Sequence, residues 1–153
     1  MLLAAHYKIP VSVLVVIHTP DLQVLLLERA DTPDFWQSVT GSQNEGETPL
    51  QTAQREVREE TGFESANFIL IDWHQQNRYE IYARWRDRYA PGVTHNTEHV
   101  FSLQLPQPSP VVLAPREHSR YLWLPWREAA DKAFSPSNAA AIRELPQRVA
   151  MPR

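Results

Sequence analysis

Residues 41–63, GSQNEGETPLQTAQREVREETGF, constrain this chain more than any other stretch. The run TPLQ at 48–51 combines a capping threonine, a proline suited to the first helical position and a glutamine placed to complete a capping box. Gly62 then supplies a stop signal. The segment therefore predicts a helix over residues 49–60 that begins and ends at defined points.

Two faces of this helix differ in chemistry. At about 100° per residue, Leu50, Ala53 and Val57 fall on one face, and we expect all three to pack inward. Glu56 and Glu60 are four residues apart, so they lie one above the other on the neighbouring face. Like charges at this spacing repel each other, and a bound dication would remove that penalty. Oxygen ligands without cysteine favour a hard cation, Mg²⁺ or Mn²⁺.

The composition indicates one compact domain over residues 1–153, with a loose tail over 146–153. A formal net charge of −3 offers no broad basic field for a long nucleic acid. The absence of cysteine excludes disulfides and thiol catalysis and is compatible with a cytoplasmic location. The apolar run 11–17 is too short to span a membrane. We therefore expect no membrane association, and the sequence gives no sign of an obligate protein partner.

Apolar periodicity and chain-breaking residues predict the remaining elements. Strands are expected at 11–18, 22–28, 38–40, 68–74, 78–85, 98–105, 111–113 and 121–124, and closing helices at 126–133 and 137–145. Strands mixed with helices, and joined by hairpins more than by regular crossovers, predict an α/β fold with a mixed sheet between helices.

The spacing within residues 41–63 matches a known signature. Gly41 is followed by Glu47 and then by REVREETGF at 55–63, which fills every fixed position of the pattern glycine, glutamate, REUxEExGU, where U is a bulky apolar residue. The chain thus resembles the Nudix hydrolases, which cleave a nucleoside diphosphate linked to another group with the help of a divalent metal. The resemblance implies the Nudix fold, an α/β/α sandwich. An ordinary solvated charged helix is the alternative for the EVREE run alone.

Segments 7–12, 32–42, 88–94 and 96–98 resemble the Nudix branch that acts on 7,8-dihydroneopterin triphosphate in folate biosynthesis. That resemblance implies a pyrophosphohydrolase that takes a small-molecule triphosphate to the monophosphate and pyrophosphate. A water deprotonated with help from a glutamate would attack in line. Residues 73–77 depart from the branch. A general nucleoside triphosphate pyrophosphohydrolase for nucleotide clearance and a non-catalytic nucleotide-sensing module remain as alternatives, and the intact box disfavours the second.

The resemblance also implies a set of site residues. The implied metal ligands are Glu56, Glu60 and, from outside the box, Glu117. The implied catalytic carboxylates are Glu56, Glu59, Glu60 and Glu117, of which the last three remain open as the general base. Glu47 and Glu80 are further candidates for a ligand or an orienting partner. The implied substrate contacts are Lys8, Arg29, Thr40, Tyr79, Glu80, Ile81, Tyr82, His118 and Ser135.

Several of these contacts have structural alternatives. A tyrosine of the strand 79–82 could stack on a pterin ring, and Glu80 could bind the ring's amino group. The same tyrosines could equally serve sheet packing. Arg29 could be a surface ion pair, and Ser135 could be a helix cap.

Overall fold

Strand β1 (Val11–His18) lies at the centre of the fold because both of its faces are buried. A computed structural model describes residues 6–150 of the chain. In it, Val13, Val15 and Ile17 belong to one apolar core cluster, and Leu14 and Val16 belong to a second cluster on the opposite face. This alternation follows from the two-residue period of a strand. The molecule therefore has one core on each side of its sheet.

Seven strands form the sheet, in the order β3-β2-β1-β6-β5, with β4 beside β1 and β7 beside β2. The other strands are β2 (Gln23–Arg29), β3 (Trp36–Gln37), β4 (Val39–Ser42), β5 (Ile69–Glu80), β6 (His95–Gln104) and β7 (His118–Pro125). β1 and β6 run parallel, whereas the other pairs are antiparallel. β1 pairs with β2 only at His18↔Val24, whereas β4 pairs with β1 from Ser12 to Val15. β1 and β2 therefore diverge toward the Ser12 end of β1.

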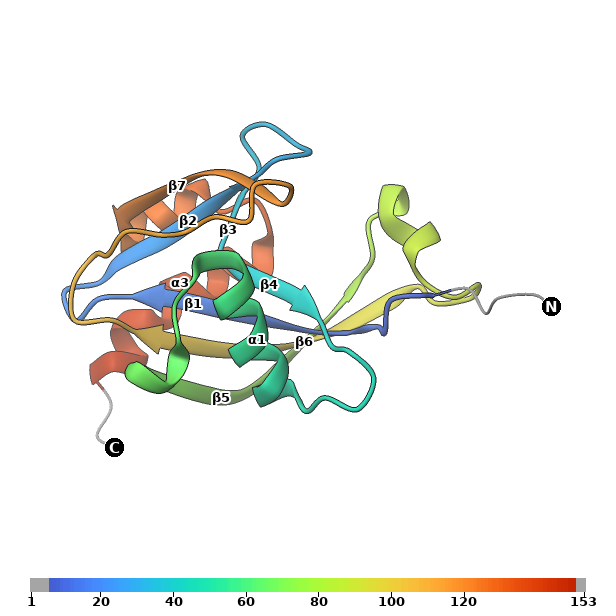
Figure 1. Cartoon of the computed structure of the whole chain (residues 1–153), viewed down its shortest axis with the longest axis horizontal. Helices are drawn as coiled ribbons and strands as arrows, with labels where there is room; N and C mark the ends of the chain where they lie inside the picture. The colour runs from blue at the N-terminus through green and yellow to red at the C-terminus, as the bar shows by residue number, and fades with distance from the viewer. Residues whose placement is uncertain (1–5, 151–153) are drawn as a thin grey trace.

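Helices cover both faces of this sheet (Figure 1). α1 (Pro49–Thr61) packs on one face through Ala53 and Val57. α2 (Trp126–Lys132) and α3 (Pro136–Ala150) pack on the other face through residues that include Ala129 and Ile142. The predicted mixed sheet between helices is confirmed. No helix within residues 6–150 is long and apolar enough to cross a membrane.

Helix α1 begins and ends where its local sequence predicts. The Thr48 side chain accepts a hydrogen bond from the Gln51 N–H at 3.1 Å, and the Gln51 side chain accepts one from the Thr48 N–H at 3.0 Å. At the other end Gly62 has φ 79° and donates its N–H to the Arg58 carbonyl at 2.9 Å. These contacts satisfy backbone groups that a helix end leaves unpaired.

The expectation that Leu50 packs inward is wrong. Leu50 is 45% exposed, whereas Ala53 and Val57 are fully buried. The buried side of α1 also includes Glu56 and Glu60. Because these two glutamates turn inward, the buried face is rotated away from Leu50, which lies roughly 70° from its centre at 100° per residue.

Three predicted elements differ from the structure because pairing partners decide where a strand runs. Residues 68–74 and 78–85 form one strand, β5, with an irregularity between Asp72 and Gln76 where His74 has φ 53°. Its ladder with β6 ends at the pair Glu80↔His95, and the chain then turns into the 3₁₀ helix η2 (Ala83–Arg88). A second 3₁₀ helix, η1 (Ser65–Asn67), precedes β5. Residues 111–113 are not a strand.

The closing helix is longer than predicted. α3 continues through Pro146 to Ala150, so the expectation of a loose tail from residue 146 is wrong as far as residue 150, and residues 151–153 lie outside the described part of the chain. Arg148 anchors this last turn, because its guanidinium donates to the Gln75 side chain at 2.8 Å and lies 4.5 Å from the centre of the Trp73 ring. These long-range contacts offset the loss of one helical hydrogen bond at proline.

The end of α1 yields a stability prediction. A Cβ at residue 62 would lie 3.2 Å from the Val112 Cβ and would force a side chain into the left-handed region. Gly92 also has a positive φ, 89°, with open space around its Cβ position. We expect Gly92→Ala to lower the free energy of unfolding by about 1–2 kcal/mol and Gly62→Ala to lower it by more. Urea unfolding of both variants measures the difference, and equal losses would show that Val112 does not constrain this turn.

Candidate active site

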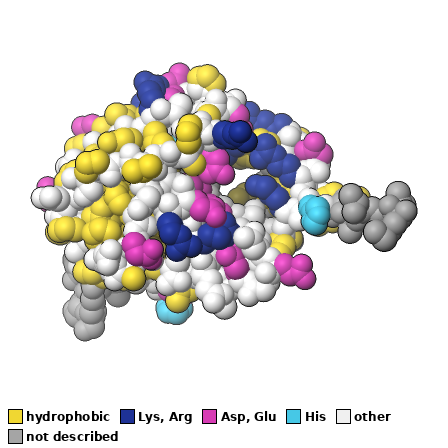
Figure 2. Space-filling model, in the orientation of Figure 1, with side chains coloured by type: hydrophobic (Ala, Val, Ile, Leu, Met, Phe, Trp, Pro, Cys, Tyr) yellow, Lys and Arg dark blue, Asp and Glu magenta, His cyan; other side chains and the backbone are white. Residues whose placement is uncertain are grey.

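A cleft of about 1140 Å³ is lined by every residue implied as a metal ligand, a catalytic carboxylate or a substrate contact, whereas Glu47, a further candidate, does not line it. Those residues are Lys8, Arg29, Thr40, Glu56, Glu59, Glu60, Tyr79, Glu80, Ile81, Tyr82, Glu117, His118 and Ser135. They come from the N-terminal segment, from α1, from positions in or beside β2, β4, β5 and β7, and from the residue before α3. Figure 2 shows acidic and basic side chains gathered around a hollow on this side of the molecule.

Two buried carboxyl groups from α1 lie at one end of the cleft. Glu56 is 7% exposed and Glu60 is 3% exposed, and their side chains hydrogen-bond to each other. Burial raises the pKa of both groups, and for Glu60 the neighbouring charge of Glu56 raises it further. Glu60 Oε1 is buried without a hydrogen-bond partner. The pair therefore holds acceptor oxygens that a cation would satisfy.

The absence of a side chain at Gly41 makes room for this pair. Gly41 belongs to β4, which packs against α1. A Cβ at this position would overlap the carboxyl group of Glu56. A larger residue would displace the Glu56 carboxylate from the place where it meets Glu60.

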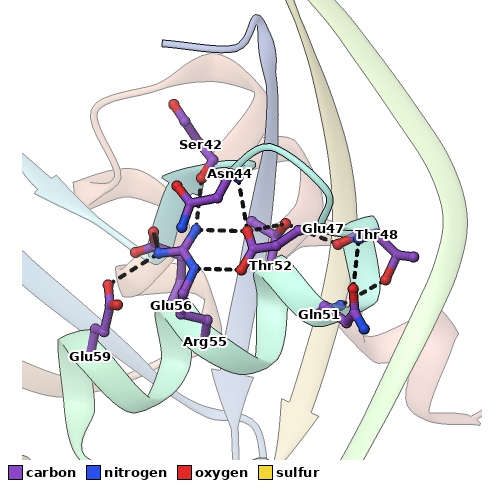
Figure 3. A network of polar contacts seen from close by, with 9 residues as sticks. All are labelled: Ser42, Asn44, Glu47, Thr48, Gln51, Thr52, Arg55, Glu56 and Glu59. Carbon is purple, nitrogen blue, oxygen red and sulfur yellow. Dashed lines mark hydrogen bonds and ion pairs between the residues drawn. The ribbon is translucent and has the colours of Figure 1, made fainter. Parts of the chain in front are cut away.

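Arg55 fixes the direction of the Glu56 carboxylate (Figure 3). Its guanidinium donates to Glu56 Oε1 at 2.7 Å, to both carboxylate oxygens of Glu47 at 2.7 and 3.0 Å, and to the Ser42 carbonyl at 2.9 Å. It also donates to Glu59 at 3.2 Å. Hydrogen bonds from Arg55 lower the pKa of Glu47 to about 2. Glu47 is therefore an orienting partner of Arg55, which was one of its two predicted roles.

Comparison with known proteins agrees with this geometry. The model of the NUDIX domain matches residues 8–145. The chain belongs to the Nudix family. Dihydroneopterin triphosphate diphosphatase of Escherichia coli is 49% identical over 142 residues, which cover 91% of this chain and 93% of that one. The Haemophilus influenzae protein of the same name is 40% identical over 145 residues, covering 93% and 90%.

A solved structure shows the same likeness. The E. coli dihydroneopterin triphosphate pyrophosphohydrolase matches this Nudix chain with a TM-score of 0.86 and 47% sequence identity, over 94% of this chain and 99% of that one. The match spans both the sheet and its covering helices. Family membership and fold are therefore established together.

Nudix enzymes generally use a divalent metal, and the Glu56–Glu60 pair suits a hard cation. Its oxygens are crowded, buried and partly unpaired, which is the donor set that Mg²⁺ or Mn²⁺ selects. Within residues 6–150, no three His, Asp or Glu side chains are already arranged as a metal site. Glu117 lines the same cleft, and its charge adds to the raised pKa of Glu60. Phosphate oxygens and water would complete the coordination of Mg²⁺ in such a site.

Cations face these carboxylates across the cleft. Lys8 is an exposed residue, but its ammonium end enters the cleft, where desolvation and the charges of Arg88 and Arg29 lower its pKa. The Lys8 N–H also donates to the Arg88 carbonyl at 2.8 Å. Arg29 is held by two hydrogen bonds to Asp31, each 2.8 Å long. These cations form a positive cluster suited to a polyphosphate, and Arg88 is a member that sequence reasoning had not singled out.

An aromatic cluster borders the same side of the cleft. Phe35 stacks on Phe134 with ring centroids 4.1 Å apart, and Trp85 of η2 lies 5.9 Å from Phe35. Tyr82 packs edge-on against both Trp85 and Phe134. The Arg29 guanidinium lies 4.8 Å from the centre of the Trp85 ring. Sequence reasoning missed this cluster because its members come from three segments that no periodic pattern links.

His118 is a neutral ring at pH 7. Burial lowers its pKa to about 4, and the Gln37 side-chain amide lies 3.0 Å from its Nε2. Its 4.0 Å separation from Glu60 is therefore not an ion pair at neutral pH, although the atoms lie within ion-pair distance. A neutral imidazole packed this tightly positions its neighbours more than it binds phosphate.

The remaining predicted contacts divide between the cleft and the scaffold. Ser135 lies before the start of α3, where its hydroxyl accepts from the Asn138 N–H at 3.4 Å, which is the capping role. The Thr40 hydroxyl donates to the Val13 carbonyl at 2.9 Å. Ile81 is buried, and its N–H donates to Thr94. The Glu80 side chain is 65% exposed and pairs with Arg86 at 3.2 Å.

The close approach of β4 to α1 generates a prediction about the candidate metal site. In Gly41→Ala, the Glu56 carboxyl group must move, and because it is the end of a flexible side chain the fold should survive. We expect Mn²⁺ affinity to fall by about 10- to 100-fold, while the free energy of unfolding in chelator changes by less than about 1 kcal/mol. Electron paramagnetic resonance of free Mn²⁺ measures the affinity. Gly92→Ala is the control, and an unchanged affinity in Gly41→Ala would contradict the assigned role of Gly41.

Proposed function

We propose that this chain is a divalent-metal-dependent pyrophosphohydrolase that converts 7,8-dihydroneopterin triphosphate to the monophosphate and pyrophosphate. The proposal rests on two observations that agree, one from the relatives of the chain and one from its cleft. Relatives that bear the name dihydroneopterin triphosphate diphosphatase match nearly the whole chain. In the same chain, a buried carboxylate pair faces a cation cluster across one cleft. We place the enzyme in the cytoplasm, with which a cysteine-free chain is compatible.

Each charged residue of the cleft has a part in this reaction. Glu56 and Glu60 would hold the metal, and Glu117 lines the same cleft. Arg55 keeps the Glu56 carboxylate directed at Glu60, because Glu47 and the Ser42 carbonyl hold the guanidinium in place. Lys8, Arg29 and Arg88 would bind phosphate oxygens. The metal, when bound, neutralises phosphate charge and polarises the phosphorus under attack.

A carboxylate must take the proton of the attacking water. Glu59 is half-exposed and engaged by Arg55, and Glu60 is engaged by Glu56. Within the described residues, the Glu117 side chain makes no hydrogen bond or ion pair. Glu117 is therefore the carboxylate most available for proton transfer, and we assign it that role. Pyrophosphate leaves from the opposite side of the phosphorus atom.

A substrate panel tests the function. With Mg²⁺ present, 7,8-dihydroneopterin triphosphate should give a higher kcat/KM than ATP or GTP, and phosphorus NMR should show pyrophosphate with no orthophosphate. Glu117→Gln should lower kcat far more than it raises KM, since a proton-transfer group acts mainly in the transition state. A higher kcat/KM for a nucleoside triphosphate would replace this proposal with nucleotide clearance. Binding of triphosphates without hydrolysis would indicate a sensing module.

A further inference from the structure

A second polar cluster lines the cleft on the opposite side of the sheet from α1. It comprises Ser12, Asn77, Tyr79, Asn96 and Glu98, which come from β1, β5 and β6. In the sheet, Glu98 of β6 is paired with Ser12 of β1 on one side and with Asn77 of β5 on the other. Tyr79 of β5 is paired with Asn96 of β6. Paired residues of neighbouring strands share a face. These five side chains therefore point to the face that α3 covers.

Glu98 is the charged member of this cluster, and it is 4% exposed. It accepts a hydrogen bond from the Asn77 amide at 3.3 Å and another from Ser137. Burial raises the pKa of its carboxyl group. No lysine, arginine or histidine pairs with it among the described residues. A carboxylate has room for about four hydrogen bonds, so this one retains acceptor capacity.

Asn96, beside Glu98 in the cluster, provides a further hydrogen-bond acceptor without a partner. Asn96 Nδ2 donates to the Ser12 hydroxyl at 2.7 Å and to the Tyr79 hydroxyl at 3.0 Å. Asn96 Oδ1 is buried with no hydrogen-bond partner. Buried polar atoms are nearly always paired. This end of the cleft is therefore suited to a ligand that presents N–H donors.

Glu80 lies in a different environment from Glu98. The sequence had assigned ring recognition to Glu80. It alternates with Tyr79 on β5, so it points to the other face of the sheet. Its side chain is 65% exposed and already pairs with Arg86 at 3.2 Å. Water competes for an exposed carboxylate of this kind, so it would discriminate poorly between rings.

A pterin ring has an edge that fits a buried carboxylate. Its 2-amino-4-oxopyrimidine part carries an amino N–H and a ring N–H side by side, and two parallel donors match the two oxygens of a carboxylate. Guanine carries the same edge. Adenine has a ring nitrogen acceptor beside its amino group. This nitrogen would face a carboxylate oxygen, so two acceptors would be placed against each other.

We propose that Glu98 is the specificity residue of this enzyme, and that it accepts hydrogen bonds from the 2-amino-4-oxopyrimidine edge of the substrate ring. The inference rests on the proposed function for the identity of the ring as a pterin. Glu56 and Glu60 reach the cleft from α1 on one side of the sheet, and Glu98 reaches it from the other. The ring and the triphosphate are therefore bound at different ends of one cleft.

Glu98→Gln tests this assignment, because it keeps the shape of the side chain and an acceptor for Asn77 while replacing one carboxylate oxygen with a donor. We measure kcat and KM for 7,8-dihydroneopterin triphosphate, GTP and ATP. Glu98→Gln should lower kcat/KM by about 10- to 100-fold for the first two, chiefly through KM. Hydrolysis of ATP should be equal or faster. Glu64→Gln removes an exposed carboxylate outside the cleft and should change none of these values.

The pattern across substrates separates recognition from a structural role. An equal loss for all three substrates, or no loss for any, would overturn the assignment of Glu98. Thermal unfolding and the ATP rate show whether Glu98→Gln is folded. If the wild-type enzyme prefers ATP to 7,8-dihydroneopterin triphosphate, the proposed function fails, and the effect of Glu98→Gln on the GTP-to-ATP ratio still supports or overturns recognition of the shared edge.

Discussion

The buried contact between Glu56 and Glu60 is the constraint around which this end of the molecule is built. Two carboxyl groups that share a desolvated space repel each other once both are ionised. Burial raises the pKa of both groups, and the charge of Glu56 raises the pKa of Glu60 further. The neighbouring sequence accommodates them. Gly41 provides space for one carboxyl group, and Arg55 holds it in place. A dication bound at the proposed metal site would relieve this repulsion.

The sheet also positions a second group of polar residues, at the end of the cleft near α3. β1 diverges from β2 and pairs with β4 over its first half. The cleft at this point is lined by residues from both sides of the sheet. The end near α1 is rich in charge, with carboxylates facing Lys8 and the arginines. The end near α3 has one buried carboxylate among neutral polar groups. A ligand with a polyanionic part and a donor-bearing ring fits both ends at once.

Local signals in the sequence were enough to predict helix α1 and to place Glu56 and Glu60 next to each other on it. The capping box of α1, its terminal glycine and the spacing of Glu56 and Glu60 all act within a few residues, so they do not depend on the rest of the fold. Sequence reasoning was less successful where distant partners decide. The course of residues 81–85 depends on where β6 begins, and the inward face of α1 depends on which residues meet β4. Glu98 could not be singled out from sequence, because its burial follows from its register with β1 and β5.

Calorimetry of Mn²⁺ binding near pH 6, repeated in buffers of different ionisation enthalpy, tests the central claim most directly. The number of protons released per ion follows from the buffer dependence of the heat. Because burial raises the pKa of both Glu56 and Glu60, and the charge of Glu56 raises that of Glu60 further, the metal should displace a measurable fraction of a proton from the wild-type pair. Glu60→Gln should bind Mn²⁺ more weakly and release fewer protons. Binding without proton release, or equal release from the wild type and Glu60→Gln, would contradict the identification of this pair as the metal site.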